Sequence, residues 1–223
     1  MHARRILFRM IAVALALGSL SGATRLAGAA SITYSGRGIG AKVVLVNPQP
    51  NVLVFSDTGD LPPSGGTLSA SLLTIALGTT LASQTISAST SGSGGVATST
   101  AHQEHVVAFS GQAAQVTADV VEAHSQATCG GVQGSSTVTN LTFGGNAVVV
   151  TGQPNQTVSI SGVATLVINE QIVVAGAEDI TVNALHLTLG TGEQVILSSA
   201  HSDVSCVVPT RPSTWARVKQ IYR

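Results

Sequence analysis

Two segments of the chain echo each other, and their pattern decides the fold. Val116–Cys129 reads VTADVVEAHSQATC, and Val195–Cys206 reads VILSSAHSDVSC. Each contains Ala-His-Ser, three further residues and a cysteine, and the chain has no other cysteine. Small apolar residues that alternate with polar ones are typical of strands with one buried face. The echo therefore predicts two similar strands whose cysteines leave the same face at the same place.

A period of two assigns the residues of each segment to two faces. The cysteine face carries Val121, Ala123, Ala127 and Cys129 in the first segment, and Ile196, Ala200, Val204 and Cys206 in the second. The other face of the second segment holds Val195, Leu197, His201, Asp203 and Ser205. His124 and His201 each precede a cysteine by five residues, an odd offset. If the cysteines mark the core, both histidines face solvent.

The amino terminus has the pattern of an export signal. Arg4, Arg5 and Arg9 precede an apolar run from Met10 to Leu17, and Ala27-Gly28-Ala29 supplies small residues for cleavage. We expect residues 1–29 to form a helical signal peptide that is removed on export. The paired arginines leave both the general secretory and the twin-arginine routes open.

The only two cysteines of an exported chain predict a disulfide between Cys129 and Cys206. Two cysteines alone do not complete a zinc site. A disulfide needs Cα atoms within about 7 Å of each other. The two strands must therefore be neighbours or face each other across the core, and we expect the bond to be buried and slow to reduce.

Charge and composition exclude one class of partner and favour one class of fold. Between residues 31 and 206, Arg37 and Lys42 stand against ten acidic residues, a formal charge of −8. Nucleic-acid binding needs basic patches, which such a domain lacks. Aromatic residues make up 3% of the chain, so small and β-branched side chains must fill the core. That composition favours strands over helices.

Apolar runs separated by glycine- and proline-rich breaks predict one domain of about ten to twelve short strands over residues 31–206. We expect strands at 42–46, 52–55, a pair within 67–90, and then 96–110, 113–129, 135–143, 147–151, 157–160, 163–174, 180–189 and 194–206. Thr58–Gly66, Ser91–Gly95 and the turn at Gly144-Gly145-Asn146 are expected loops. The predicted fold is an all-β, antiparallel β-sandwich. A β-barrel is one alternative, and a β-solenoid is another, although a solenoid should show a fixed short repeat.

Three segments in this order resemble one known family. They are SDTGDLPPSGG at 56–66, SSTVTNLT at 135–142 and ITVNALH at 180–186. Over Tyr34–Cys206 the chain is similar to the choice-of-anchor P family. The resemblance implies an exported bacterial surface protein whose shared domain has no established activity and is joined to differing C-terminal sorting signals.

The segment 207–223 departs from that family pattern, because it has neither an apolar span nor a terminal sortase motif. Ser213 or Thr214 can cap a short C-terminal helix, and the four basic residues of the segment give it a charge of +4. Three roles stay open for this basic tail. It is a terminus packed loosely on the acidic domain, a recognition tag for sorting or attachment, or a helix that lies on a membrane surface.

The motifs that usually carry chemistry are incomplete in this chain. No Gly-x-Ser-x-Gly elbow or phosphate loop occurs, and Gly36-Arg37-Gly38-Ile39-Gly40 lacks the spacing of a dinucleotide site. His102 and His105 are three residues apart, which places them on opposite faces of a strand. His124 and His201 could share a metal with Glu122 or Asp203 only if their strands pair. We assign no catalytic, cofactor or metal residues.

Two further motifs have ordinary structural interpretations. Asp57 and Asp60 flank Thr58-Gly59 and fit a turn with capped backbone amides better than a calcium site. Asn140-Leu-Thr and Asn155-Gln-Thr match the glycosylation pattern, but in a chain that resembles bacterial proteins we interpret them as strand and turn residues.

The sequence as a whole predicts a secreted or cell-surface structural or interaction protein without catalytic activity or cofactor. Its surface or extracellular partner is unknown, and the basic tail can engage a sorting system or a membrane surface. An extracellular glycan- or ligand-binding module is the first alternative, for which exposed aromatic residues would be the sign. A secreted hydrolase with an unrecognised site is the second, for which shifted carboxylates in a cleft would be the sign.

Overall fold

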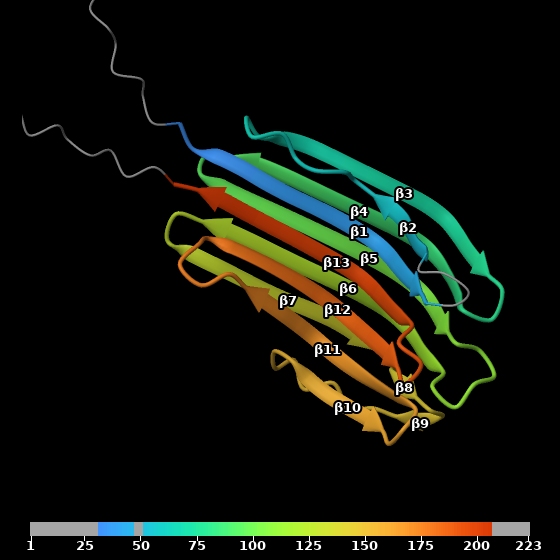
Figure 1. The fold of residues 1–223 in the computed structure, drawn as a ribbon. Coiled ribbons are helices and arrows are strands. Elements are labelled where there is room, and N and C mark those ends of the chain that lie inside the picture. Colours follow the sequence, from blue (N-terminus) through green and yellow to red (C-terminus); the bar gives the residue numbers. More distant parts are fainter. Residues whose placement is uncertain (1–30, 47–50, 207–223) are drawn as a thin grey trace, which may run out of the picture.

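The strands form two antiparallel sheets that pack face to face (Figure 1). The computed structural model describes residues 31–46 and 51–206. Its strands are β1 (Thr33–Leu45), β2 (Asn51–Asp57), β3 (Gly66–Leu77), β4 (Leu81–Ser93), β5 (Val96–Ala108), β6 (Val116–Thr128), β7 (Gly131–Thr139), β8 (Thr142–Phe143), β9 (Asn146–Ala147), β10 (Gln156–Ile160), β11 (Ala164–Val173), β12 (Asp179–Leu189) and β13 (Gln194–Ser205). The expected signal peptide, C-terminal helix and basic tail lie outside the described residues.

The strand order confirms the predicted β-sandwich. The six-stranded sheet has the order β10-β11-β12-β13-β1-β2. The seven-stranded sheet has the order β3-β4-β5-β6-β8-β9, and β7 also pairs with β6. Both sheets are open, with separate edges, so neither of the alternative architectures applies. Among the described residues, no helix has the length and hydropathy that a membrane span requires.

The predicted strands match the structure except in three places. Strand β1 begins at Thr33, well before the expected start at residue 42. Strand β4 continues through Ser93, so the expected loop 91–95 shrinks to a turn at Gly94 and Gly95. The expected strand 135–143 breaks at Asn140, whose φ is 51°, and the residues after Ala147 do not continue as a strand. The hairpin turn itself is confirmed, because Gly144 and Gly145 have φ of 57° and 78° between the paired residues Phe143 and Asn146.

A row of irregular positions crosses the middle of each sheet and shifts the alternation of side chains. In the six-stranded sheet Ser56, Asn169 and Ser198 have φ near +50°, and in the seven-stranded sheet Thr85 and His105 do. The register skips each of them, for example from Ser199 to Leu197 opposite Ile39 and Ala41. In the six-stranded sheet the pairing register is the same on both sides of each skip, so neighbouring strands shift their alternation at the same level without an extra residue. Between β4 and β5 the register itself shifts, as at a β-bulge, from Ala82 to Gln84 and from Gln84 to Ser87.

The irregular position at Ser198 explains why the predicted faces of β13 are wrong on one side of it. After it, Ala200 and Val204 are buried and His201 is half-buried, as the period of two predicts. Before it, Val195 and Leu197 are buried and Ile196 is not, which is the reverse of the prediction. The strict period fails because the alternation shifts at Ser198, where φ is 54°, although the register of β13 against β1 and β12 is unchanged there.

Small side chains bring β1 close to the opposite sheet. Gly36, Gly38 and Gly40 are buried and alternate with the half-buried Arg37 and Ile39. An added Cβ on Gly38 would lie 2.8 Å from the Thr100 carbonyl oxygen of the other sheet. The Gly36–Gly40 segment, which fits no nucleotide site, therefore serves close packing between sheets.

Candidate functional site

The predicted disulfide between Cys129 and Cys206 is present, and it joins the two sheets at one end of the sandwich. The two Cα atoms are 5.6 Å apart. Strands β6 and β13 face each other across the core, which is one of the two arrangements that the echo allowed. The predicted burial is wrong, because Cys129 is exposed and Cys206 is half-buried. Each cysteine follows the last residue of its strand and so lies beyond the packed layers.

The two copies of Ala-His-Ser meet through their serines. Ser125 and Ser202 are buried, and their hydroxyl oxygens lie 2.8 Å apart across the core. The Ser198 hydroxyl also donates to the Val121 carbonyl of the opposite sheet at 2.8 Å. A buried hydroxyl needs a partner, so these bonds fix how β6 and β13 face each other. The echo therefore marks a matched pair of strands rather than a chemical site.

The predicted metal alternative for His124 and His201 is not supported by their positions. They lie on strands of different sheets, and each sits between buried residues, so their side chains point to opposite surfaces. His201 Nδ1 is 3.4 Å from Asp179 Oδ1. No group of three histidine, cysteine or acidic residues that could hold a metal occurs within 31–46 and 51–206.

The prediction that His102 and His105 lie on opposite faces of a strand, which also rests on the period of two, is wrong. His105 is exposed at a bulge with φ of 49°, while His102 is half-buried on the outer side of the same strand. Neither side chain points into the core, because the bulge turns His105 outward. His102 Nε2 is 3.4 Å from Glu104 Oε1, so this group pairs locally on the surface of the seven-stranded sheet.

Asp57 and Asp60 belong to a turn held by Arg37. Asp57 accepts the Gly59 backbone amide at 2.9 Å, which confirms the predicted capped turn. The Arg37 guanidinium donates from Nε and Nη2 to the two Asp57 carboxylate oxygens, at 2.8 and 2.5 Å, and it reaches Asp60 at 3.3 Å. The hydrogen bond from Arg37 lowers the pKa of Asp57. Sequence reasoning did not predict this bidentate pair.

Both glycosylation-like asparagines are turn residues, as predicted. Asn140 and Asn155 have φ of 51° and 59°. The Asn140 amide donates to Asp119 Oδ2 at 2.5 Å, and Asn155 Oδ1 accepts the Gln171 backbone amide at 2.9 Å. Asn155 thus holds the backbone of β11, and Asn140 holds a side chain of β6.

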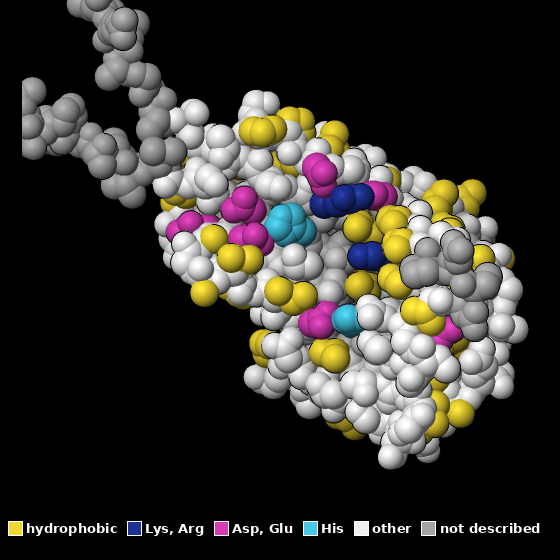
Figure 2. Space-filling model, viewed as in Figure 1, with side chains coloured by type: hydrophobic (Ala, Val, Ile, Leu, Met, Phe, Trp, Pro, Cys, Tyr) yellow, Lys and Arg dark blue, Asp and Glu magenta, His cyan; other side chains and the backbone are white. Residues whose placement is uncertain are grey.

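Figure 2 shows the face of the six-stranded sheet, where the few charged side chains stand in separate groups among hydrophobic and other uncharged residues. One group there was missed by sequence reasoning. Glu170 Oε2 lies 2.9 Å from His186 Nδ1 and accepts the Asn183 side-chain amide at 2.6 Å. Asn183 and His186 are three residues apart, so a strict period of two would separate them. The alternation of β12 shifts at the level of the irregular positions Asn169 and Ser198 in the strands beside it, and this places both side chains near Glu170.

The contact shifts the pKa of both partners. The hydrogen bond to Glu170 raises the pKa of His186 against the opposing effect of burial. The hydrogen bond from His186, together with that from Asn183, lowers the pKa of Glu170. The other imidazole nitrogen of His186 lies 3.4 Å from Gln194 Oε1.

This pair predicts a stability maximum at mildly acidic pH. The contribution of Glu170 is present above its ordinary pKa of 4.5 and is lost as the pH falls through its lowered folded pKa. The contribution of His186 is full below its ordinary pKa of 6.5 and is lost as the pH rises through its raised folded pKa. We expect the stability difference between wild type and His186→Gln to shrink by about 1 kcal/mol between about pH 5.5 and about pH 8.5. Urea unfolding at both pH values measures it, and an unchanged difference would contradict the pairing.

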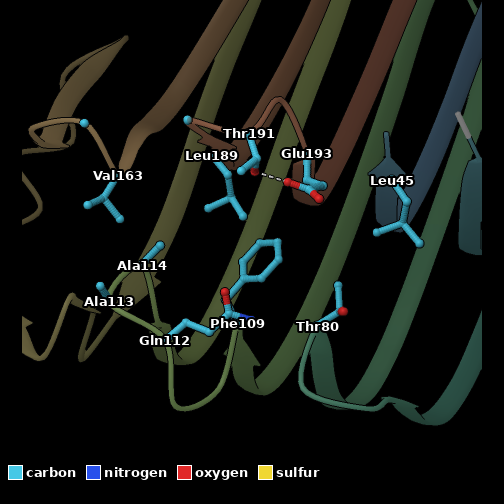
Figure 3. A pocket seen from close by; sticks show the side chains of 12 residues that line it. Leu45, Thr80, Phe109, Gln112, Ala113, Ala114, Val163, Leu189, Thr191 and Glu193 are labelled. Carbon is cyan, nitrogen blue, oxygen red and sulfur yellow. Dashed lines mark hydrogen bonds between the residues drawn. The ribbon is translucent and has the colours of Figure 1, made fainter. Parts of the chain in front are cut away.

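A cavity of about 620 Å³ opens at the end of the sandwich where β1 ends and β13 begins. Phe109, Leu189, Leu45 and Val163 supply apolar walls, and Glu193 is its one acidic lining residue. Phe109 adopts φ of 50°, donates its backbone amide to Thr80 at 3.0 Å, and directs its ring toward Leu189 (Figure 3). Figure 3 also shows the Thr191 hydroxyl bonded to Glu193. The volume of the cavity lies within the range of small-molecule sites.

Comparison of the chain with protein-family models, with curated proteins and with solved structures gave no match. The resemblance to the choice-of-anchor P family therefore rests on the sequence segments and stays a prediction. Two of those segments have a structural role in this chain. Ser56–Gly66 contains the Arg37-bound turn, and Ile180–His186 contributes Asn183 and His186 to the Glu170 group.

Proposed function

We propose that this chain is an exported structural or interaction protein of the cell surface or the extracellular space, without catalytic activity. The observation that carries the proposal is the disulfide between Cys129 and Cys206, which joins the two sheets. Structural disulfides form and persist in oxidising compartments outside the cytosol. The signal-like residues 1–29 and the resemblance to exported surface proteins support the same location.

The arrangement of the polar groups supports a role without catalysis. Asp57 is engaged by Arg37, and Glu170 is engaged by His186 and Asn183, so these carboxylates serve ion pairs between strands. General acid–base chemistry needs such groups within reach of a substrate in a cleft. The cavity at the sandwich end is lined by neither pair.

Export is tested by where the protein is found and where it begins. We expect cells that carry the full-length gene to release or display a protein that starts at Ala30 or Ser31. N-terminal sequencing of the extracellular fraction, with a cytosolic enzyme as the control for lysis, measures both. Protein that begins at Met1 and stays in the cytosol would reject the proposed location.

The cavity favours a ligand-binding module as the second candidate. Its apolar walls with a single carboxylate suit a small amphiphile that carries a hydrogen-bond donor. Glycan binding has less support, because Tyr34, Phe55, Phe109 and Phe143 are the aromatic residues of the described part and none of them is exposed. Thermal-shift screening of medium-chain amines and of oligosaccharides distinguishes the two ligand classes. A shift with an amine that Leu189→Arg abolishes would support this candidate.

A further inference from the structure

The free edge of the seven-stranded sheet is formed by β3. This strand of 12 residues pairs with β4 on one side and with no other strand of the described chain. An unpaired edge presents backbone N–H and C=O groups to any strand that approaches. In Figure 1, β3 lies along one border of the sandwich over nearly its full length.

Strand β3 lacks most of the features by which sheet edges usually avoid pairing, although its register against β4 skips Leu73, opposite the irregular Thr85. The edge strands of the six-stranded sheet are short, with 7 residues in β2 and 5 in β10. Strand β3 is nearly as long as the strands inside its sheet, and its sequence GTLSASLLTIAL has no charged residue and no proline. Charges, prolines and short length are the usual protections of an edge.

Two leucines on β3 are exposed. Leu73 is 86% exposed and Leu72 is 40% exposed. Strand β7 also has an unpaired edge, but its exposed residues are glycine, glutamine, serine and threonine. An apolar side chain beside a free backbone edge favours a strand partner, because pairing buries the side chain and satisfies the backbone together.

The distribution of charge selects a second copy as that partner. Residues 31–206 carry a formal charge of −8, so two copies repel each other at most relative orientations. Residues 61–103, which include all of β3 and β4, contain no aspartate, glutamate, lysine or arginine. Two copies can therefore bring their β3 edges together without placing like charges opposite each other.

We propose that two copies of this chain associate through β3, antiparallel and about a two-fold axis that passes close to Leu73. The two seven-stranded sheets then form one continuous sheet, and an isologous contact of this kind closes at a dimer. Antiparallel pairing adds about one backbone hydrogen bond per paired residue and brings facing Cα atoms to about 4.5–5.5 Å. The two Leu73 side chains lie beside each other on the outer face.

The inference rests on the proposed interaction role, for which it names one partner. Leu73→Lys places a charge on each side of the two-fold axis, and we expect it to weaken the dimer at least about tenfold. Val149→Lys is the matched control, because Val149 is 82% exposed and lies outside β3. Sedimentation equilibrium of the protein expressed from the full-length chain should give twice the monomer mass for wild type and for the control.

A cross-link at the axis tests the pairing itself. Leu73→Cys should form an intermolecular disulfide in air, because facing Cα atoms in such a pair lie within disulfide range. Val149→Cys should not. A monomeric wild type, a dimer unchanged by Leu73→Lys, or an open polymer would each overturn the proposal. A monomer that is still exported with its Cys129–Cys206 bond would reject the dimer while leaving the proposed location intact.

Discussion

Replacing Cys129 and Cys206 together by alanine is expected to lower the free energy of unfolding by about 2 to 5 kcal/mol. The bond joins residues 77 positions apart, so it constrains a large part of the unfolded chain. The β-sheet signal in circular dichroism should persist, because the bond lies at the end of the sandwich and is not part of the packed core of β6 and β13. Urea unfolding of the double variant and of wild type measures the loss.

Reduced wild-type protein is the matched control for that variant. Because Cys129 is exposed, we expect a reductant to reach the sulfur atoms while the sheets stay folded. Reduced wild type should then have the unfolding midpoint of the double alanine variant. Two alkylated thiols in protein taken from the extracellular fraction without reductant would reject the bond. Equal midpoints with and without reductant would show that the bond contributes no stability.

The echo gave correct information about the fold because it reflects packing between two strands. Alternation placed Ala123 and Ala200 in the core and both Ala-His-Ser histidines on the surface, and the cysteines were paired correctly. The burial of the bond was predicted wrongly, since alternation indicates the face of a residue but not whether its strand still has a neighbour there. Cys129 and Cys206 follow the last strand residues and therefore lie at the rim.

Local sequence could not reveal where the alternation shifts, and the missed contacts depend on those positions. Ser198 and His105 adopt positive φ without being glycine, a conformation that the surrounding sheet imposes rather than the residue itself. The alternation reverses at each of these positions, which exchanges the faces of Ile196 and Leu197 and turns His105 outward. Glu170 contacts both Asn183 and His186, which a strict period of two would place on opposite faces of β12. Predicting it requires the register of β11 against β12, which is a tertiary property.

A large effect of a single small substitution is expected at Gly38, where β1 packs against the opposite sheet. A Cβ there would lie 2.8 Å from the Thr100 carbonyl oxygen, 3.0 Å from the Ser89 carbonyl oxygen and 3.1 Å from the Ala88 Cβ. Two of these neighbours are backbone atoms of β4 and β5, which cannot turn aside as the end of a flexible side chain can. The two sheets must separate locally to admit a methyl group.

Gly38→Ala should therefore destabilise the protein by about 3 kcal/mol through overpacking. In an open strand position the same substitution stabilises by about 0.5 to 1 kcal/mol, because glycine loses more backbone entropy on folding. The sign of the change thus reports the close approach of the sheets. Gly130→Ala is the control, since Gly130 is exposed and its Cβ would have Thr128 Oγ1 at 3.7 Å as its one neighbour. Urea unfolding of both variants measures the difference, and a neutral or stabilising Gly38→Ala would show that β1 does not pack so closely against β4 and β5.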